Sequence, residues 1–179
     1  MKISAIAIAA MLLMSAPARA RAAGVPDIDW KGHAATVIFF ILHDCPICNS
    51  YVPEMNRIVR EYGGRGFGFV AAYLDVDFPP AEAQYHACEY RFDFPFVVDG
   101  KRELAARSGT TTVPEAAVFD RNGGILYRGR IDDLYAGIGQ RRSAPTQRNL
   151  REALDAIAAG EKPKRALLPG VGCPIEPIK

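Results

Sequence analysis

Two apolar runs and one helical period set the framework of the first half of the chain. Residues 35–42, ATVIFFIL, and residues 67–75, FGFVAAYLD, are nearly continuous runs of apolar side chains. Such runs are typical of strands that are buried on both faces of a sheet. Between them, apolar residues recur every three or four positions from 45 to about 62, which predicts a helix ending at Gly63-Gly64. Pro53 lies inside this helix and should kink it.

Shorter elements follow the same alternation in the second half. The pattern predicts a helix from Pro79-Pro80 to about Tyr90, a strand at 96–98 and a short helix at 101–107. It then predicts strands at 116–120 and 125–130 around an Arg-Asn-Gly-Gly turn, and a last helix that Thr146 caps and that ends before Gly160. Strands that alternate with helices, followed by a hairpin, indicate an α/β fold with a central mixed β-sheet flanked by helices.

The chain length and composition fit one globular domain. The chain has 179 residues, of which 49% are hydrophobic and 23% are charged. We expect the domain to span residues 34–160, after an entry segment at 21–33 and before an extended tail at 161–179 that is rich in Pro and Lys. The formal net charge of +2 gives no reason to expect nucleic-acid binding, and we expect a monomer.

The first 20 residues have the pattern of a signal peptide. Lys2 is followed by a 12-residue apolar stretch, residues 3–14, and then by the small-residue cleavage pattern Ala18-Arg19-Ala20. We therefore expect an exported, periplasmic protein, with a retained N-terminal membrane anchor as the alternative. Export matters for the four cysteines, because thiols outside the cytosol can remain oxidised.

The segment Cys45-Pro46-Ile47-Cys48 carries the chemistry, because it lies where the first strand meets the first helix. Unpaired N–H groups and the helix dipole at a helix start stabilise an anion, and so lower the pKa of a thiol placed there. We expect Cys45 to be the attacking thiol and Cys48 to resolve the mixed disulfide, with Pro46 and Ile47 supporting the first helical turn. The redox centre would be a Cys45–Cys48 disulfide, without a metal or organic cofactor.

Other uses of this pair fit less well. Covalent haem attachment requires a His at position 49, where the chain has Asn. Structural zinc requires a second close pair of ligands, and a purely structural disulfide gains little by closing so small a loop.

Four features in order resemble the thioredoxin-like superfamily. They are the strand that leads into CPIC, Pro53 five residues after Cys48, Thr112-Val113-Pro114 before a strand, and the segment 119–133. Within the superfamily the chain resembles exported redoxins related to alkyl hydroperoxide reductase and thiol-specific antioxidant proteins.

The resemblance implies a thioredoxin-like fold and a thiol–disulfide oxidoreductase. It implies that Pro114 is cis, packs against the cysteine pair and, with Val113 and Thr112, shapes a groove for a substrate peptide. The partners it implies are exported cysteine-containing proteins, among them apocytochromes, and a membrane-bound thiol electron donor.

Some positions depart from the thioredoxin pattern. His43-Asp44 precedes Cys45 where thioredoxins have Trp, and a carboxylate there opposes thiolate formation while a protonated His43 favours it. The buried acid of the preceding strand is missing, so Glu54 and Glu115 are candidates for moving protons, with solvated surface as the default interpretation of each.

Two rival functions remain alternatives. A thiol peroxidase would need Thr and Pro at positions occupied by Leu42 and Ile38. A copper-handling protein of this fold would bind through two cysteines and a downstream histidine, but no histidine follows His86 and the cysteine spacing is one residue short.

Cys88 and Cys173 have no assigned partner in the sequence. Cys88 lies in a predicted helix, where a cysteine usually acts as a small buried hydrophobe. For Cys173 three uses are open: a Cys88–Cys173 disulfide that clamps the tail, which we rank first, a third redox cysteine that reaches Cys45 or Cys48, or a link to another chain.

Overall fold

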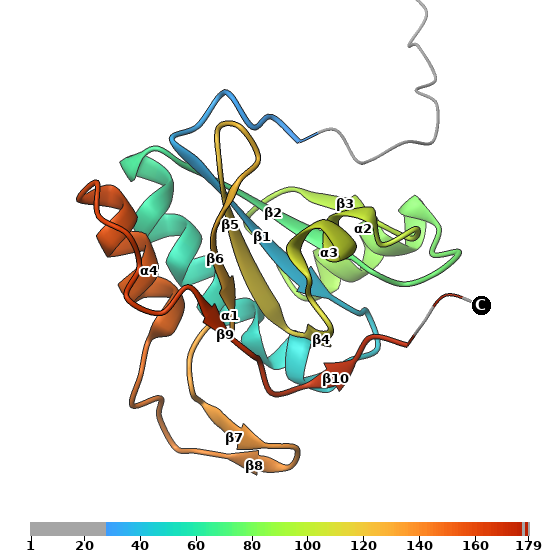
Figure 1. Ribbon diagram of the computed structural model, residues 1–179. Coiled ribbons are helices and arrows are strands. Elements are labelled where there is room, and N and C mark those ends of the chain that lie inside the picture. Colours follow the sequence, from blue (N-terminus) through green and yellow to red (C-terminus); the bar gives the residue numbers. More distant parts are fainter. Residues whose placement is uncertain (1–27, 177, 179) are drawn as a thin grey trace, which may run out of the picture.

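A six-stranded mixed sheet organises the computed structural model, which describes residues 28–176 and 178. The strand order is β3-β2-β1-β5-β6-β9 (Figure 1). The strands are β1 (Ala35–Ile41), β2 (Phe67–Tyr73), β3 (Phe96–Val98), β5 (Glu115–Asp120), β6 (Ile125–Gly129) and β9 (Leu167–Leu168). The helices are α1 (Pro46–Tyr62), α2 (Pro80–Glu89), α3 (Glu103–Ser108) and α4 (Asn149–Ala158), with a 3-10 turn η1 (Gly63–Arg65) after α1.

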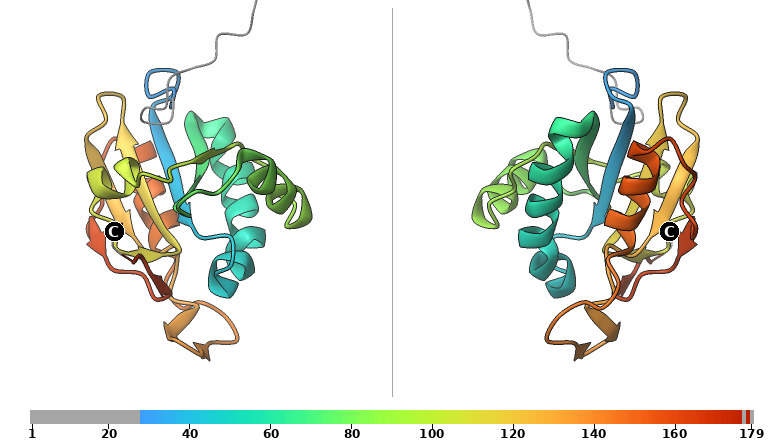
Figure 2. Two further views of the ribbon diagram at one scale, coloured as in Figure 1. Left: turned by 90° about the vertical axis from the view of Figure 1, so that its right-hand side faces the viewer. Right: turned by 90° about the vertical axis from the view of Figure 1, so that its left-hand side faces the viewer.

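Strand β1 is the centre of the sheet and of the core. It pairs parallel with β2 and antiparallel with β5, and all seven of its residues are buried. Helices flank the sheet on both sides (Figure 2), which is why an unbroken apolar run is stable here. Each large side chain buried in this way contributes roughly 1.5–3 kcal/mol. The predicted fold, a mixed sheet between helices, is confirmed.

Helix α1 packs beside α4 (Figure 1), and polar contacts join the two helices. The Tyr62 hydroxyl donates to Asp155 Oδ1 at 3.1 Å, and Arg151 Nε donates to Glu54 Oε1 at 3.0 Å. Pro53 lies inside α1, which runs on to Tyr62 as the glycine pair predicted.

The prediction that Thr146 caps the last helix is wrong. Helix α4 begins at Asn149, and the residue before it, Arg148, makes no side-chain cap. The Thr146 hydroxyl instead donates to Asp133 Oδ2 at 2.5 Å. Thr146 therefore fixes the loop that follows β6 rather than the helix.

The C-terminal tail adds two short strands that the sequence pattern did not predict. Strand β9 joins the outer edge of the main sheet by pairing parallel with β6. Further on, β10 (Cys173–Pro174) pairs antiparallel with β4 (Thr112–Val113), as Figure 1 shows. Outside the tail, β7 (Tyr135–Gly137) and β8 (Gln140–Arg141) form a small separate hairpin before α4. The tail is extended, but it is attached to the domain at two places.

The expected signal peptide lies outside the described residues. The described part of the entry segment packs on the domain, because the rings of Trp30 and Phe119 meet edge to face at 5.1 Å. Within residues 28–176 and 178, no helix combines the length and the apolar character needed to cross a membrane.

Candidate functional site

The two cysteines of CPIC lie at the start of α1, as the sequence predicts. Cys45 is the residue before the first helical turn, with extended backbone angles (φ −82°, ψ 109°), and Pro46 opens the helix. The side chains of both cysteines are about 1% exposed. Helix starts of this kind favour a thiolate through their unpaired N–H groups.

The segment before β5 faces Cys45. The Val113–Pro114 peptide bond is cis, as the resemblance implies, and both residues are buried. The distance from Cys45 Sγ to the carbonyl oxygen of Val113 is 4.0 Å. Thr112 and Val113 form β4, whose backbone groups can pair with an extended strand.

The disulfide in this structure joins Cys45 to Cys173. The two residues are 128 positions apart in the chain, and their Cα atoms are 6.4 Å apart, within the normal range for a disulfide. Cys48 is a free, buried thiol. The first-ranked pairing, Cys88–Cys173, is therefore wrong, and Cys45 is bonded here to the tail rather than to Cys48.

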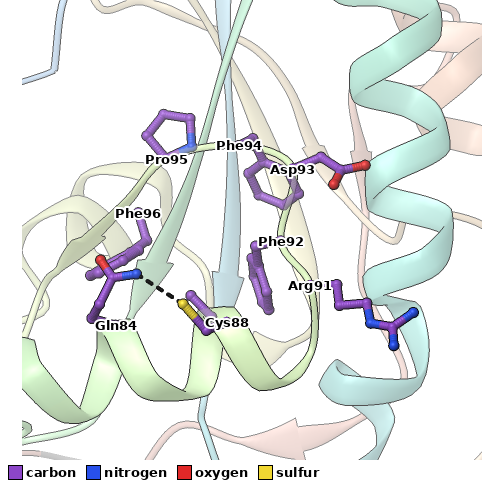
Figure 3. Close-up of a pocket in the computed structure, with 9 residues that line it drawn as sticks. Gln84, Cys88, Arg91, Phe92, Asp93, Phe94, Pro95 and Phe96 are labelled. Atoms are coloured by element: carbon purple, nitrogen blue, oxygen red, sulfur yellow. Dashed lines mark hydrogen bonds between the residues drawn. The ribbon is translucent and has the colours of Figure 1, made fainter.

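Cys88 lies elsewhere, on α2, and the expectation that it is buried is also wrong. Its thiol is free and exposed, and it accepts a hydrogen bond from Gln84 Nε2 at 3.2 Å (Figure 3). The buried residues of α2 are Ala83, His86 and Ala87, one helix face. Cys88 points away from that face because one residue turns an α-helix by about 100°. It borders a shallow pocket with Phe92 and Phe96.

The tail occupies the edge of β4 as a short antiparallel strand. Cys173 lies opposite Val113, and the N–H of Ile175 donates to the carbonyl of Thr111 at 3.0 Å. Gly172 is buried against Val113 so closely that a Cβ there would overlap the Val113 carbonyl oxygen. This position therefore requires glycine, for reasons of space rather than backbone angle.

The environment of Cys48 keeps its thiol protonated. The pKa of Cys48 is raised to about 12, mainly by burial and in smaller part by the negative charges of Asp75 and Asp44, and a hydrogen bond with the Leu42 backbone opposes this rise. Cys48 is thus a weak nucleophile at neutral pH unless its surroundings change.

His43 and Asp44 differ in their contacts. His43 Nδ1 lies 2.8 Å from Asp75 Oδ1, and the His43 backbone N–H donates to Asp75 Oδ2 at 3.1 Å. Its ring stacks on Phe78, with 4.6 Å between ring centres. Asp44 is exposed, although its carboxylate lies within 4.8 Å of the polar atoms of His43 and Asp75. Asp75 therefore fixes His43, a role that the sequence did not reveal.

The two candidate acids have different surroundings. Glu115 directly follows Pro114, is 1% exposed, and accepts a hydrogen bond from the Gly170 N–H at 2.7 Å. Burial raises the pKa of Glu115, and its second oxygen, Oε2, has no hydrogen-bond partner among the described residues. Glu54 instead bonds Arg57 at 2.7 Å as well as Arg151, so it belongs to the polar contacts between α1 and α4.

The residues weighed for the rival functions occupy apolar or paired positions. Ile38 lies in the centre of β1 and is fully buried, and Leu42 packs against the core. His86 is buried, and its Nδ1 lies 2.9 Å from the Tyr73 hydroxyl.

The sequence did not predict the contacts of several site residues. They are Asp75, Thr111, Gly170, Gly172 and Ile175. Gly170 and Gly172, which precede Cys173, carried a signal, because closely spaced glycines often mark a close backbone approach. Asp75 carried one as well, since it ends the second buried run.

One protein family matches the sequence of this chain. The family model described as Redoxin matches residues 27–135, more than half of the chain. No curated protein matches.

Solved structures share the fold. An uncharacterized conserved protein from Geobacillus kaustophilus is 29% identical, with a TM-score of 0.71 over 84% of this chain and 80% of that one. A hypothetical protein from Sinorhizobium meliloti 1021 is 24% identical, with a TM-score of 0.70 over 82% and 81% of the two chains. A thioredoxin-like protein solved in its oxidized form is 20% identical, with a TM-score of 0.53 over 73% and 82%.

Proposed function

Because the chain belongs to the redoxin family of thioredoxin-like thiol–disulfide oxidoreductases, we propose that it exchanges disulfides with exported proteins through Cys45 and Cys48. In this proposal Cys45 is the nucleophile, Cys48 is the resolving thiol, and the protein works in the periplasm after removal of residues 1–20. The redox centre needs no metal or organic cofactor, because two cysteine thiols supply both electrons.

The observation that carries the proposal is the disulfide of Cys45 with a cysteine on an extended strand. Cys45 lies at a helix start, 4.0 Å from the Val113 carbonyl, and β4 pairs with the strand that contains the partner cysteine. An extended peptide of a substrate protein can pair with β4 in the same way and present its cysteine to Cys45.

The exchange proceeds in two balanced steps. The Cys45 thiolate attacks one sulfur of a substrate disulfide, which forms a mixed disulfide and releases the other substrate sulfur as a thiolate. The Cys48 thiolate then attacks Cys45 Sγ, which releases the second substrate thiolate and leaves a Cys45–Cys48 disulfide. Two electrons pass from the protein to the substrate, and the reverse order oxidises a substrate dithiol.

Residues around the pair would support these steps. The backbone of Val113 and Thr112 would bind the substrate strand, and Pro114 would shape the groove. His43, held by Asp75, and Asp44 would set the local charge near Cys45. Exported cysteine proteins, among them apocytochromes, would be substrates, and a membrane-bound thiol protein would restore the dithiol.

Insulin reduction with dithiothreitol as electron donor tests the proposal. The wild-type protein should accelerate the reaction, Cys45→Ser should lose at least about 100-fold of that activity because the attacking sulfur is gone, and Cys88→Ser should retain it. Full activity in Cys45→Ser would refute the proposal. The reduction potential of the Cys45–Cys48 couple then gives the direction: near about −270 mV it suits a reductant, and near about −120 mV an oxidant.

A further inference from the structure

The tail is attached to the domain twice, and the two attachments differ in kind. The first is β9, where the N–H groups of Arg128 and Arg130 donate to the carbonyls of Ala166 and Leu168, each at 2.8 Å. The second lies at β4 and includes the disulfide to Cys45. Residues 169–172, Pro-Gly-Val-Gly, connect them. Reduction of the disulfide therefore leaves the first attachment in place.

The second attachment uses the groups that the proposed function assigns to a substrate. Cys173 pairs with Val113, the N–H of Ile175 donates to Thr111, and the Ile175 side chain packs against the core. Beyond it, the Arg102 side chain donates to the carbonyl of Glu176. Figure 1 shows this strand lying along β4, below the start of α1. No second peptide can pair with this edge of β4 while the tail is bound.

We propose that the C-terminal strand is an internal substrate and that Cys173 is a third redox cysteine, which competes with Cys48 for Cys45 and so closes and opens the peptide groove. This inference rests on the proposed function, because it assigns to Cys173 the place that a substrate cysteine takes in the mixed disulfide. It makes Cys173 a catalytic residue of the exchange rather than part of a structural clamp.

The exchange that opens the groove balances without an external oxidant. Cys48 loses its proton to water, and its thiolate attacks Cys45 Sγ. The Cys45–Cys173 bond breaks, the Cys45–Cys48 bond forms, and the electron pair leaves with the Cys173 sulfur, which takes up a proton. One disulfide and one thiol exist before and after the step. Because β9 and a four-residue connection keep Cys173 near Cys45, the reverse step is intramolecular and competes well with substrates in solution.

A substitution at Gly172, the residue before Cys173, can prevent docking of the strand without removing the Cys173 thiol. A methyl group at Gly172 would overlap the Val113 carbonyl, so Gly172→Ala should prevent the strand from docking while the Cys173 thiol remains. Gly64→Ala is a matched control, because a Cβ at Gly64 meets no atom within 4 Å.

Disulfide mapping tests the inference on the full-length protein. Reduced protein is oxidised in glutathione buffers, quenched with acid, alkylated and mapped by mass spectrometry. The wild type should contain both Cys45–Cys48 and Cys45–Cys173 disulfides. Their ratio should be the same whether the protein enters the buffer reduced or already oxidised. Cys48→Ser should contain Cys45–Cys173, and Gly172→Ala should lower the Cys45–Cys173 share at least about tenfold relative to Gly64→Ala.

Contrary outcomes are equally defined. A Cys48→Ser protein that forms glutathione adducts at Cys45 in place of Cys45–Cys173, or an unchanged ratio in Gly172→Ala, overturns the internal substrate. So does a Cys45–Cys173 disulfide that never converts to Cys45–Cys48.

The proposed function has a separate readout in reduced Cys173→Ser, which lacks the competing thiol. If Cys173→Ser reduces insulin, but mapping finds no Cys45–Cys173 disulfide in the wild type, the internal substrate alone is refuted. Inactive wild type and inactive Cys173→Ser, with normal interconversion of the two disulfides, refute the proposed function alone.

Discussion

The backbone N–H of Gly170 donates a hydrogen bond to Glu115, with 2.7 Å between the nitrogen and Oε1. This contact links the tail to the residue directly after Pro114. The Glu115 side chain is also close to Arg128 and Thr110, which lower its pKa, but burial outweighs them and the pKa is raised. A buried acid, one oxygen of which has no hydrogen-bond partner within residues 28–176, thus directly follows Pro114.

Glu115 should make the stability of the protein depend on pH. Because its pKa is raised by folding, its contribution to stability is present below the ordinary carboxyl pKa and is lost as the pH rises through the raised value. Urea unfolding at pH 4 and pH 7 should show Glu115→Gln gaining on the wild type between the two values. The gain should be on the order of 1 kcal/mol, the cost of one incompletely paired buried group.

Exposed Glu161→Gln is the control for this measurement and should follow the wild type at both pH values. A Glu115→Gln protein whose stability relative to the wild type is the same at pH 4 and pH 7 would contradict the assignment of a raised pKa.

The step in which Cys48 displaces Cys173 should accelerate with pH. With a pKa of about 12, the thiolate is a small fraction of Cys48 at neutral pH, and that fraction rises tenfold for each pH unit. A pH jump from acid should therefore show conversion of Cys45–Cys173 to Cys45–Cys48 that is about 100-fold faster at pH 9 than at pH 7. Acid quenching and peptide mapping measure the rate.

The charges that face Cys48 provide the matched variant. Asp75 and Asp44 raise its pKa, and Asp44 is exposed, so Asp44→Asn removes one charge without disturbing a buried contact. This variant should exchange faster than the wild type at every pH. A rate that is already constant between pH 7 and pH 9 would mean that Cys48 is ionised at neutral pH, contrary to its burial.

The fold and the position of Cys45 at a helix start could be predicted from the sequence because they depend on local patterns. The runs at 35–41 and 67–73 are buried on both faces, so their apolar character needs no knowledge of their neighbours. A cysteine pair directly after such a strand is placed at a helix start by the order of elements alone.

The sequence left a Cys173 that reaches Cys45 as one of three possibilities and could not select it, because no local pattern connects residues that are 128 positions apart. Strand β10 is two residues long and contains a proline, so it has no strand periodicity. The orientation of Cys88 was missed for a related reason: the buried face of α2 consists mainly of small residues and His86, and a weak apolar stripe does not fix which way a helix faces.

Tyr51 should stabilise the region beside the cysteine pair. Its hydroxyl donates to Asp132 Oδ1 at 2.5 Å, and both residues are buried. Burial raises the pKa of Asp132, and the Tyr51 hydrogen bond counteracts this effect by stabilising the carboxylate. Tyr51→Phe should therefore lower the free energy of unfolding by about 1–3 kcal/mol at pH 7, and by less at pH 4, where Asp132 can be protonated. Urea unfolding checks the difference.

The exposed Tyr85 on α2 is the control for Tyr51. Its side chain is mostly in solvent, so Tyr85→Phe should leave the unfolding curve unchanged. A Tyr51→Phe protein as stable as the wild type at pH 7 would show that the buried carboxylate finds another donor.

The disulfide of the tail should stabilise the oxidised protein, although its proposed role is exchange. It closes a chain separation of 128 residues, and closing so long a loop removes much conformational freedom from the unfolded chain. Oxidised wild type should exceed oxidised Cys173→Ser by about 2–4 kcal/mol in the free energy of unfolding. In dithiothreitol the difference should largely disappear, because neither protein then has a disulfide and both retain the backbone pairing of the tail with β4.

Cys88→Ser is the control, because it removes a thiol that is free and exposed and forms no disulfide. Its free energy of unfolding should match that of the wild type with and without reductant.

The exchange reaction adds a second condition. Where Cys45–Cys48 replaces Cys45–Cys173, the small loop stabilises little, so the gain in the free energy of unfolding must follow the mapped fraction of Cys45–Cys173. Stability that is independent of this fraction would contradict both the stabilising role of the disulfide and its assignment as a long-range link.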